Sequence, residues 1–233
     1  MRLAVISDVH ANLQALEAVL EAIARQAVDA IYCLGDVVGY GPDADACVDL
    51  IQTHCAGVVR GNHDEAVALR HGLTGLPADG QIAARHNRVQ LAPRQRHYLA
   101  SRPYVLTAHG CTFVHASPLQ PEAWHRLDSA MLLRAQFQHF DTAVCFVGHS
   151  HVPSVVSDAL GVYEVRPGRR YLINVGSVGQ PRDGDPRAAF GVFDTDTFRY
   201  DLVRVPYDVE ATAARIREEN LPDTLAERLK RGR

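Results

Sequence analysis

Short apolar runs recur along the first two thirds of the chain, and each run ends close to a residue that can bind a metal. The runs are only a few residues long and are bounded by turn-forming residues, so they predict strands that are buried on both faces. They cover residues 3–6, 31–34, 58–60, 112–114 and 143–147. The polar residues that follow them are, in order, Asp8 and His10, Asp36, Asn62, His115, and His149 with His151.

Between these runs, apolar residues recur at helical spacing. Asn12 is a suitable N-cap for a helix that carries Leu13, Leu16, Leu20 and Ile23. The opening therefore predicts a β-α-β unit with parallel strands. Further helices are expected from about residue 43, directly after residue 64, and over about 81–91, 93–101 and 128–138. Residues 71–80 are rich in Gly, Pro and polar groups, and they predict a loop.

The second half of the chain shows hairpin patterns instead. Residues 104–108 and 111–115 flank a two-residue turn at His109 and Gly110. Two more hairpins are expected, one joining 162–165 to 171–174 and one joining 190–193 to 198–205. A mixed α/β fold, with two sheets packed face to face and helices outside, accommodates both halves. We expect one catalytic domain over 1–206 and a C-terminal helical tail over 207–233, with a helix starting at Asp208 and a break at Pro222.

Composition narrows the function classes. The chain has 233 residues, 47% hydrophobic and 22% charged, as in an ordinary globular protein. Its net charge of −3 does not favour binding to nucleic acid or to an anionic membrane, and no apolar run is long enough to span a bilayer. The five cysteines show no disulfide pattern, so a cytoplasmic location is expected.

The residues at the strand ends predict a metal centre. In an open α/β sheet, ligands bind at the carboxyl edge of the strands. Side chains at positions i and i+2 of an extended segment point to one side, so Asp8 and His10 can converge, as can His149 and His151. A carboxylate offers one oxygen to each of two cations, which makes Asp36 the expected bridge. Carboxylate, imidazole and amide ligands without Cys suit Mn²⁺, Fe or Zn²⁺.

Taken together, these motifs resemble the calcineurin-like metallophosphoesterase superfamily, and its small prokaryotic phosphodiesterase branch in particular. The matching segments are Asp-Val-His at 8–10, Gly-Asp at 35–36, Gly-Asn-His-Asp at 61–64, His115, Gly-His-Ser-His at 148–151 and 174–182. The resemblance implies a four-layer α/β/β/α sandwich. It assigns Asp8, His10, Asp36 and His151 to a first metal, and Asp36, Asn62, His115 and His149 to a second.

The same resemblance implies roles for His63 and Asp64, and the sequence itself offers candidates for substrate binding. His63 matches the family histidine beside the leaving group, and Asp64 is expected to orient it. Arg60 and Arg182 are candidates to bind phosphate oxygens, with ordinary ion-paired arginines as the alternative. Tyr40 and Trp124 are candidates to line the substrate pocket, with simple packing as the alternative.

The expected activity is hydrolysis of a phosphodiester or small phosphoester. Two divalent ions, ~3.5–4 Å apart, would activate a bridging hydroxide for in-line attack. Mn²⁺ is the first choice, with Fe, Zn²⁺ or Ni²⁺ as alternatives. The oligomeric state stays open.

Other functions remain as alternatives. A non-catalytic metal-binding scaffold should have lost ligands, yet the motifs are complete. A nuclease should show a basic groove, which the charge argues against. A Ser/Thr protein phosphatase carries a further Asp and Arg shortly after Gly-Asp, where this chain reads Val37-Val38-Gly39-Tyr40-Gly41. A dinucleoside polyphosphate hydrolase stays possible.

Overall fold

The strand–helix alternation predicted for the first quarter of the chain is present in the computed structural model, which describes residues 1–161 and 164–233. Asn12 caps the first helix, since its side-chain oxygen accepts the N–H of Ala15 at 3.1 Å. The first three strands are parallel, as expected for β-α-β units. These elements are β1 (Arg2–Ile6), α1 (Leu13–Ala24), β2 (Ala30–Cys33), α2 (Ala44–His54) and the two-residue β3 (Gly57–Val58).

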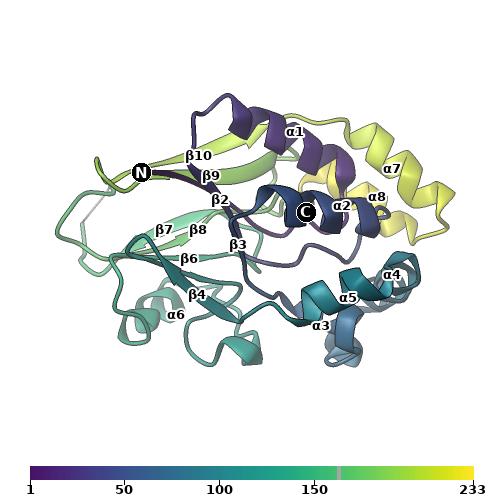
Figure 1. Cartoon of the computed structure of the whole chain (residues 1–233), viewed down its shortest axis with the longest axis horizontal. Coiled ribbons are helices and arrows are strands. Elements are labelled where there is room, and N and C mark those ends of the chain that lie inside the picture. Colours follow the sequence, from purple (N-terminus) through teal and green to yellow (C-terminus); the bar gives the residue numbers. More distant parts are fainter. Residues whose placement is uncertain (162–163) are drawn as a thin grey trace.

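Two mixed five-stranded sheets form the centre of the molecule (Figure 1). One has the order β10-β9-β1-β2-β3, and the other has the order β4-β5-β6-β8-β7. Their further strands are β4 (Val105–Ala108), β5 (Cys111–Val114), β6 (Val144–Val147), β7 (Ser154–Ser157), β8 (Tyr171–Asn174), β9 (Ala188–Asp194) and β10 (Arg199–Val205). The hairpins β4–β5 and β9–β10 are as predicted.

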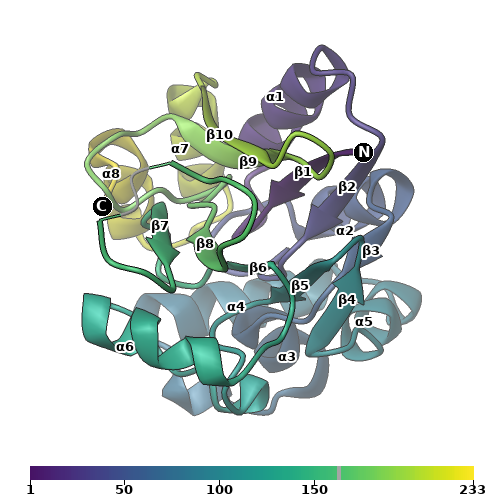
Figure 2. The same ribbon diagram turned by 90° about the vertical axis from the view of Figure 1, so that its left-hand side faces the viewer.

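Alternate residues of each strand enter different cores. In β1, Leu3 and Val5 pack between the two sheets, while Ala4 and Ile6 pack against the helices outside. In the second sheet, Phe146 faces the space between the sheets, and its neighbours on β6 face α6 (Ala130–Ala135) and the segment that follows. Figure 2 shows the resulting order of layers, with α1 above the sheets and α6 below them. The four-layer α/β/β/α sandwich is therefore confirmed.

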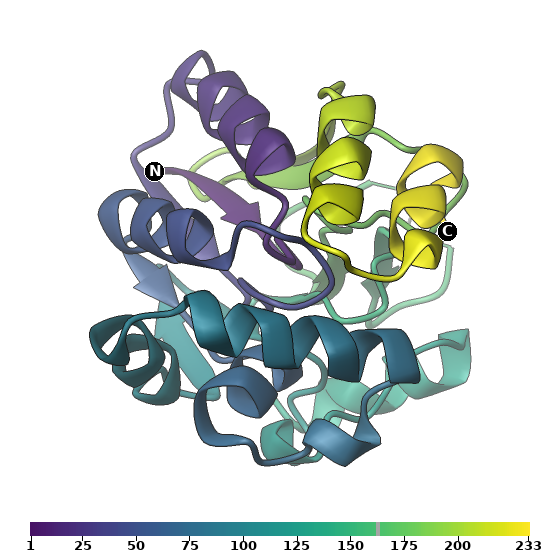
Figure 3. The same cartoon turned by 90° about the vertical axis from the view of Figure 1, so that its right-hand side faces the viewer.

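The other helices lie around one end of the sheets. They are α3 (Asn62–Leu69), α4 (Ala78–Gln90), α5 (Pro93–Ala100), α7 (Val209–Glu218) and α8 (Asp223–Arg231), with 3₁₀ turns η1 (Leu73–Gly75), η2 (Pro121–Ala123) and η3 (Gln136–Gln138). The C-terminal helices α7 and α8, yellow in Figure 3, share a cluster with Tyr40; α7 packs beside α1, and α8 packs against α7. No helix in the described part of the chain is both long and apolar enough to span a membrane.

Two predictions about local structure are wrong. The segment 71–80 contains η1, and α4 already begins at Ala78. The antiparallel partner of β8 is β7 at Ser154–Ser157, rather than 162–165, and β6 occupies the other edge of β8. Residues 162 and 163 lie outside the described part of the chain. The β7 pairing prevails because Asn174 at the end of β8 also binds Gly148 O and Ser150 Oγ, which lie directly before β7.

We expect the core between the sheets to carry much of the stability. Phe146 is fully buried and contacts Phe113 and Phe193 at centroid distances of 5.6 and 5.8 Å. Phe146→Ala should lower the free energy of unfolding by about 3–5 kcal/mol, because it removes buried area and leaves a cavity. Urea denaturation measures this, with the half-exposed Val155→Ala as the control, which should change stability little. An equal small effect of both substitutions would contradict the assignment.

Candidate metal centre

The loops after the central strands of both sheets meet at one edge. Backbone hydrogen bonds join the loop after β1 to the loop after β2, from Asp8 N to Gly35 O (3.0 Å) and from His10 N to Asp36 O (2.9 Å). Another bond joins it to the segment after β8, from Gly179 N to Asp8 O (2.9 Å). These bonds fix the positions of residues far apart in the sequence, and every residue predicted as a metal ligand lies in this region.

The backbone at these residues is left-handed, whereas the sequence pattern predicts extended segments. Asp8, His10, Asp36, His149 and His151 all have φ between 50° and 63°. Non-glycine residues in this region cost of order 1–3 kcal/mol each and cluster at functional sites. Asp8 and His10 do converge, but through this turn rather than through an extended segment.

The first cluster contains Asp8, His10 and His151. His10 Nε2 lies 3.1 Å from His151 Nε2, and Asp8 Oδ1 lies 3.7 Å from the first of these atoms and 3.3 Å from the second. The lone pairs of two unprotonated imidazole nitrogens repel each other at this distance. A proton or a cation is therefore needed between the two Nε2 atoms. Asp8 Oδ1 is buried and has no hydrogen-bond partner among the described residues, which fits a metal ligand.

Backbone carbonyls orient the imidazole rings. A carbonyl oxygen only accepts, so the facing Nδ1 carries a hydrogen and Nε2 is directed into the cluster. The pairs are His10 with Val38 O (3.2 Å), His115 with Leu34 O (2.8 Å) and His151 with Gln180 O (2.6 Å). Sequence reasoning missed these partners, because any residue type supplies a carbonyl and no signal marks them.

The second cluster contains Asp36, His115, His149 and Asn62. His115 Nε2 lies 3.3 Å from Asp36 Oδ2, 3.3 Å from His149 Nδ1 and 3.2 Å from Asn62 Oδ1. His149 and His151 thus point into different clusters, although they are two residues apart. Asp36 Oδ2 also lies 3.8 Å from His10 Nε2, so Asp36 stands between the clusters.

Burial and the close charges set the protonation of these groups. Burial opposes ionisation of Asp36, but the neighbouring histidines outweigh it and hold its pKa well below the ordinary value. Burial also opposes protonation of His115, yet Asp36 raises its pKa to about 9. Burial lowers the pKa of His149 to about 3. At pH 7 the free protein therefore has a neutral His149 and a protonated His115, and a divalent cation that binds His115 must displace its proton.

His63 lies at the edge of the first cluster. It is 3% exposed and packs against the rings of Tyr40 and His10, with centroids 4.5 and 4.9 Å away. Its Nδ1 is buried with no partner in the described structure. Burial lowers its pKa to about 4, so the ring is neutral at pH 7 in the free protein. One ring nitrogen also lies within 4.8 Å of ligand atoms of His10 and Asp36, so its position suits a metal ligand as well.

The Asp64 carboxylate accepts hydrogen bonds from three backbone N–H groups. Its Oδ1 accepts from Val37 N (2.9 Å) and Val38 N (3.3 Å), and its Oδ2 accepts from Gly61 N (3.0 Å). The carboxylate therefore joins the loop after β2 to the start of α3.

Arg60 is held by other protein groups. Its Nη1 donates to Glu65 at 3.2 Å and to the Tyr104 hydroxyl at 3.1 Å, and its Nη2 donates to Ala100 O. The ion-paired alternative describes Arg60, because these contacts direct its guanidinium to the α3–α5 contact.

Arg182 lies beside Tyr40 and near His63. Its guanidinium lies 5.6 Å from the ring centroid of Tyr40, its Nη2 donates to Gln180 Oε1 at 2.8 Å, and its positive charge contributes to the low pKa of His63. Its Nε is buried with no partner in the described residues. Tyr40 is buried between Arg182 and the rings of His10 and His63. The ring centroid of Trp124 lies 5.8 Å from that of His115.

A sequence profile of the calcineurin-like phosphoesterase superfamily domain matches residues 1–198. The chain belongs to the calcineurin-like phosphoesterase superfamily. The resemblance noted from the motifs is thereby confirmed, and the protein is a phosphoric ester hydrolase.

Similar proteins cover nearly the whole of this phosphoesterase. The uncharacterized protein MJ0912 of Methanocaldococcus jannaschii is 38% identical over 99% of this chain and 98% of its own length. The phosphodiesterase YfcE of Escherichia coli K12 is 30% identical over 84% of this chain and 89% of its own. The crystal structure of a metallophosphoesterase from Sphaerobacter thermophilus aligns with a TM-score of 0.88 and 40% identity, over 100% of this chain and 99% of that one.

Gly39 packs against His63, so a substitution at Gly39 tests whether the position of the His63 ring matters for activity. Gly39 has φ +97°, and a Cβ on it would lie 2.3 Å from His63 Nδ1. Gly39→Ala should lower kcat by about 10–100-fold, because it displaces the ring. Gly72→Ala is the matched control, since Gly72 has φ +73° but no atom near its Cβ position. Both variants should lose about 1–2 kcal/mol of stability. Equal activity in the two would show that the position of His63 does not matter.

Proposed function

We propose that this enzyme hydrolyses a phosphodiester or small phosphoester with two divalent cations that share Asp36. The observation that carries the proposal is the position of Asp36 Oδ2, 3.3 Å from His115 Nε2 and 3.8 Å from His10 Nε2. One carboxylate oxygen thus borders two sets of nitrogen and oxygen ligands from separate strands. Three groups of ligand atoms, each within 4.8 Å, overlap at His10 and Asp36.

The ligand sets divide between the two clusters. Asp8, His10, Asp36 and His151 would hold one cation, and Asp36, Asn62, His115 and His149 would hold the other. Nitrogen and oxygen donors without thiolate suit Mn²⁺, which we expect, with Fe, Zn²⁺ or Ni²⁺ as alternatives. Bound cations would supply Lewis acidity, lowering the pKa of water and offsetting negative charge on the phosphoryl oxygens.

The protein's own residues would bind and protonate the substrate. The unpartnered Nε of Arg182 and the rest of its guanidinium would bind a non-bridging phosphate oxygen. A hydroxide oxygen attacks phosphorus, the P–O bond to the leaving group breaks, and the departing oxygen takes a proton from His63. The low pKa of free His63 requires the anionic substrate to raise it on binding.

Asp64 would act by positioning, since its three backbone contacts hold the loop of Asp36 against the turn of Asn62. Residues 1–206 would form the catalytic domain. The tail at 207–233 would form part of the wall of the site, because α7 and α8 pack against Tyr40. The five unpaired cysteines favour a cytoplasmic location.

A diesterase or small-phosphoester activity is favoured over protein dephosphorylation. The relative YfcE of E. coli bears the name phosphodiesterase. The further Asp and Arg that protein phosphatases carry shortly after Gly-Asp are absent here, where the sequence reads Val37-Val38-Gly39-Tyr40-Gly41. A scaffold without activity is disfavoured, since every ligand of both sets is present.

Chelation should abolish hydrolysis of a nitrophenyl phosphodiester, and added Mn²⁺ should restore it. Asp36→Asn should lower kcat well beyond roughly 100-fold, and further than Asn62→Ala or His151→Ala, because it touches both ligand sets. Steady-state kinetics of the three variants in saturating Mn²⁺ provide the ranking. A milder loss in Asp36→Asn than in the other two would contradict the shared carboxylate.

His63→Ala should leave bound metal unchanged while its rate loss depends on the leaving group. Alkyl esters should slow by ~10²–10⁴-fold, because an alkoxide needs a proton to depart. Nitrophenyl esters should slow much less, since nitrophenolate leaves without help. The wild-type kcat should fall as pH rises through the pKa of His63 in the substrate complex, and this limb should vanish in the variant.

The competing role for His63 is metal binding or water positioning. It predicts an equal loss for both ester types, or a missing ion in His63→Ala. Rates for both esters, measured together with metal content, therefore separate the two roles.

A further inference from the structure

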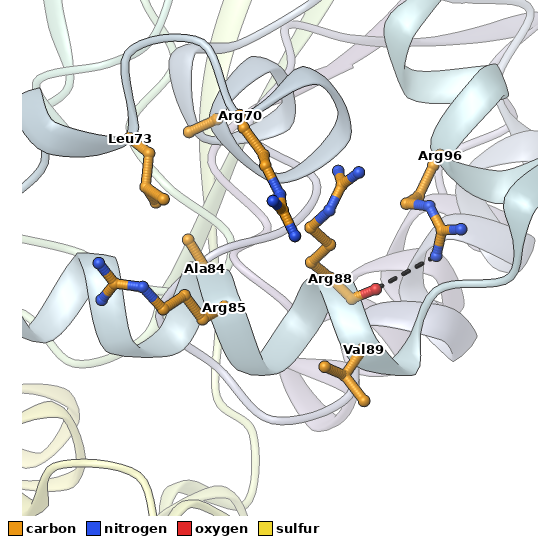
Figure 4. A pocket seen from close by; sticks show the side chains of 8 residues that line it. Arg70, Leu73, Ala84, Arg85, Arg88, Val89 and Arg96 are labelled. Atoms are coloured by element: carbon orange, nitrogen blue, oxygen red, sulfur yellow. Dashed lines mark hydrogen bonds between the residues drawn. The ribbon is translucent and has the colours of Figure 1, made fainter.

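A cavity of about 620 Å³ lies apart from the metal centre, bordered by α3, η1, α4 and α5. Figure 4 shows four arginines around it: Arg70 after α3, Arg85 and Arg88 on α4, and Arg96 on α5. Leu73, Ala84 and Val89 supply apolar walls. Pockets for small molecules have about this volume and combine apolar walls with a few converging polar groups.

The positive charge of this cavity is not neutralised by the protein. No carboxylate lines it in the part of the chain that the structure describes. None of its four arginines forms an ion pair there, whereas Arg60, Arg204 and Arg215 each face an Asp or Glu. In Figure 4 the side chains of Arg70 and Arg88 extend from opposite sides into the space between α3 and α4. Like charges placed around one cavity repel each other, and an anion bound between them would offset this repulsion.

Two of these guanidinium groups are already fixed in place. Arg88 Nη1 donates to Val67 O and Ala68 O at the end of α3, and Arg96 Nη1 donates to Arg88 O at 3.3 Å and to Leu91 O. Burial and the neighbouring Arg70 and Arg96 lower the pKa of Arg88, which is consistent with uncompensated charge. Groups held in this way lose little entropy when they bind a ligand.

The other two guanidinium groups remain available. Arg85 has one long contact, 3.5 Å from Nη2 to Gln81 Oε1, and no hydrogen bond of the Arg70 side chain is seen among the described residues. Both side chains are exposed. They can therefore close on a ligand from the open side of the cavity.

We propose that this cavity binds a small metabolite that carries two or more phosphate groups and an apolar or aromatic body. Guanidinium groups bind phosphate oxygens bidentately, and each phosphate brings about −1.5 to −2 charge at pH 7. Four guanidinium groups around one cavity exceed what a single phosphate needs. The apolar walls and stacking on arginine suit a nucleoside or similar body. This inference is independent of the proposed function, since no metal ligand takes part.

Isothermal titration of the metal-loaded enzyme with adenosine 3′,5′-bisphosphate tests the proposal. Arg70→Gln with Arg85→Gln should weaken this binding at least about tenfold, because two charge-assisted contacts are lost. Arg94→Gln with Arg126→Gln is the matched control; it removes the same charge from outside the cavity, at arginines that face Asp49 and Asp128. The control should bind like the wild type. Hydrolysis of a nitrophenyl diester should be unchanged in both double variants.

Two further arms define the ligand class. Inorganic phosphate should bind the wild type more weakly than the bisphosphate, and raising salt from about 50 to 300 mM should weaken bisphosphate binding through screening. Equal bisphosphate binding in all three proteins would place it at the metal centre and overturn the proposal. The proposal would also be overturned if the bisphosphate did not bind the wild type. It would be overturned as well if a single-stranded RNA bound the wild type more tightly than the bisphosphate and Arg70→Gln with Arg85→Gln abolished that RNA binding.

Discussion

The position of the Asp36 carboxylate is the constraint on which the centre depends. It stands between two clusters of histidines, and the backbone around it leaves room for little else. A Cβ on Gly61 would lie 2.1 Å from Asp36 Oδ1, and a Cβ on Gly35 would lie 2.5 Å from Gly61 N. The loops after β2 and β3 therefore pack backbone to backbone. Glycine is required at both positions, as the motifs at 35–36 and 61–64 have it.

The ligand loops are strained, and the layers beneath them stabilise the arrangement. Left-handed backbone at five ligands costs of order 1–3 kcal/mol for each residue. The buried cores on both faces of the two sheets offset this cost. Cation binding to the folded state would stabilise the loops further. Such sites place reacting groups accurately because the surrounding structure fixes them. The α4 helix contributes to this, since its Asn87 accepts from Gly39 N and donates to Gly41 O beside His63. Arg88 on the same helix borders the arginine cavity.

Much of the fold was predictable because its signals are local. Apolar runs, the Asn12 cap and the two-residue turn at His109 and Gly110 act within a few residues, and the structure has the elements that they predict. The convergence of the ligand residues was predictable as well, since parallel strands end at a common edge. The pairing of β7 with β8 was missed, because it depends on Asn174 contacts with a distant loop. The hydrogen-bond partners of Arg60 and Asp64 could not be predicted for the same reason, because partners such as Tyr104 and Val37 are far away in the sequence.

The central claim is that two cations bind at these strand ends and share Asp36. Anomalous X-ray diffraction from crystals of the Mn²⁺-loaded enzyme, recorded on both sides of the manganese absorption edge, tests it most directly. The account predicts two peaks per chain, one among Asp8, His10 and His151 and one among Asn62, His115 and His149, with Asp36 touching both. A single peak in fully active, metal-saturated protein, or a peak ligated by His63 in place of Asp8, would contradict it.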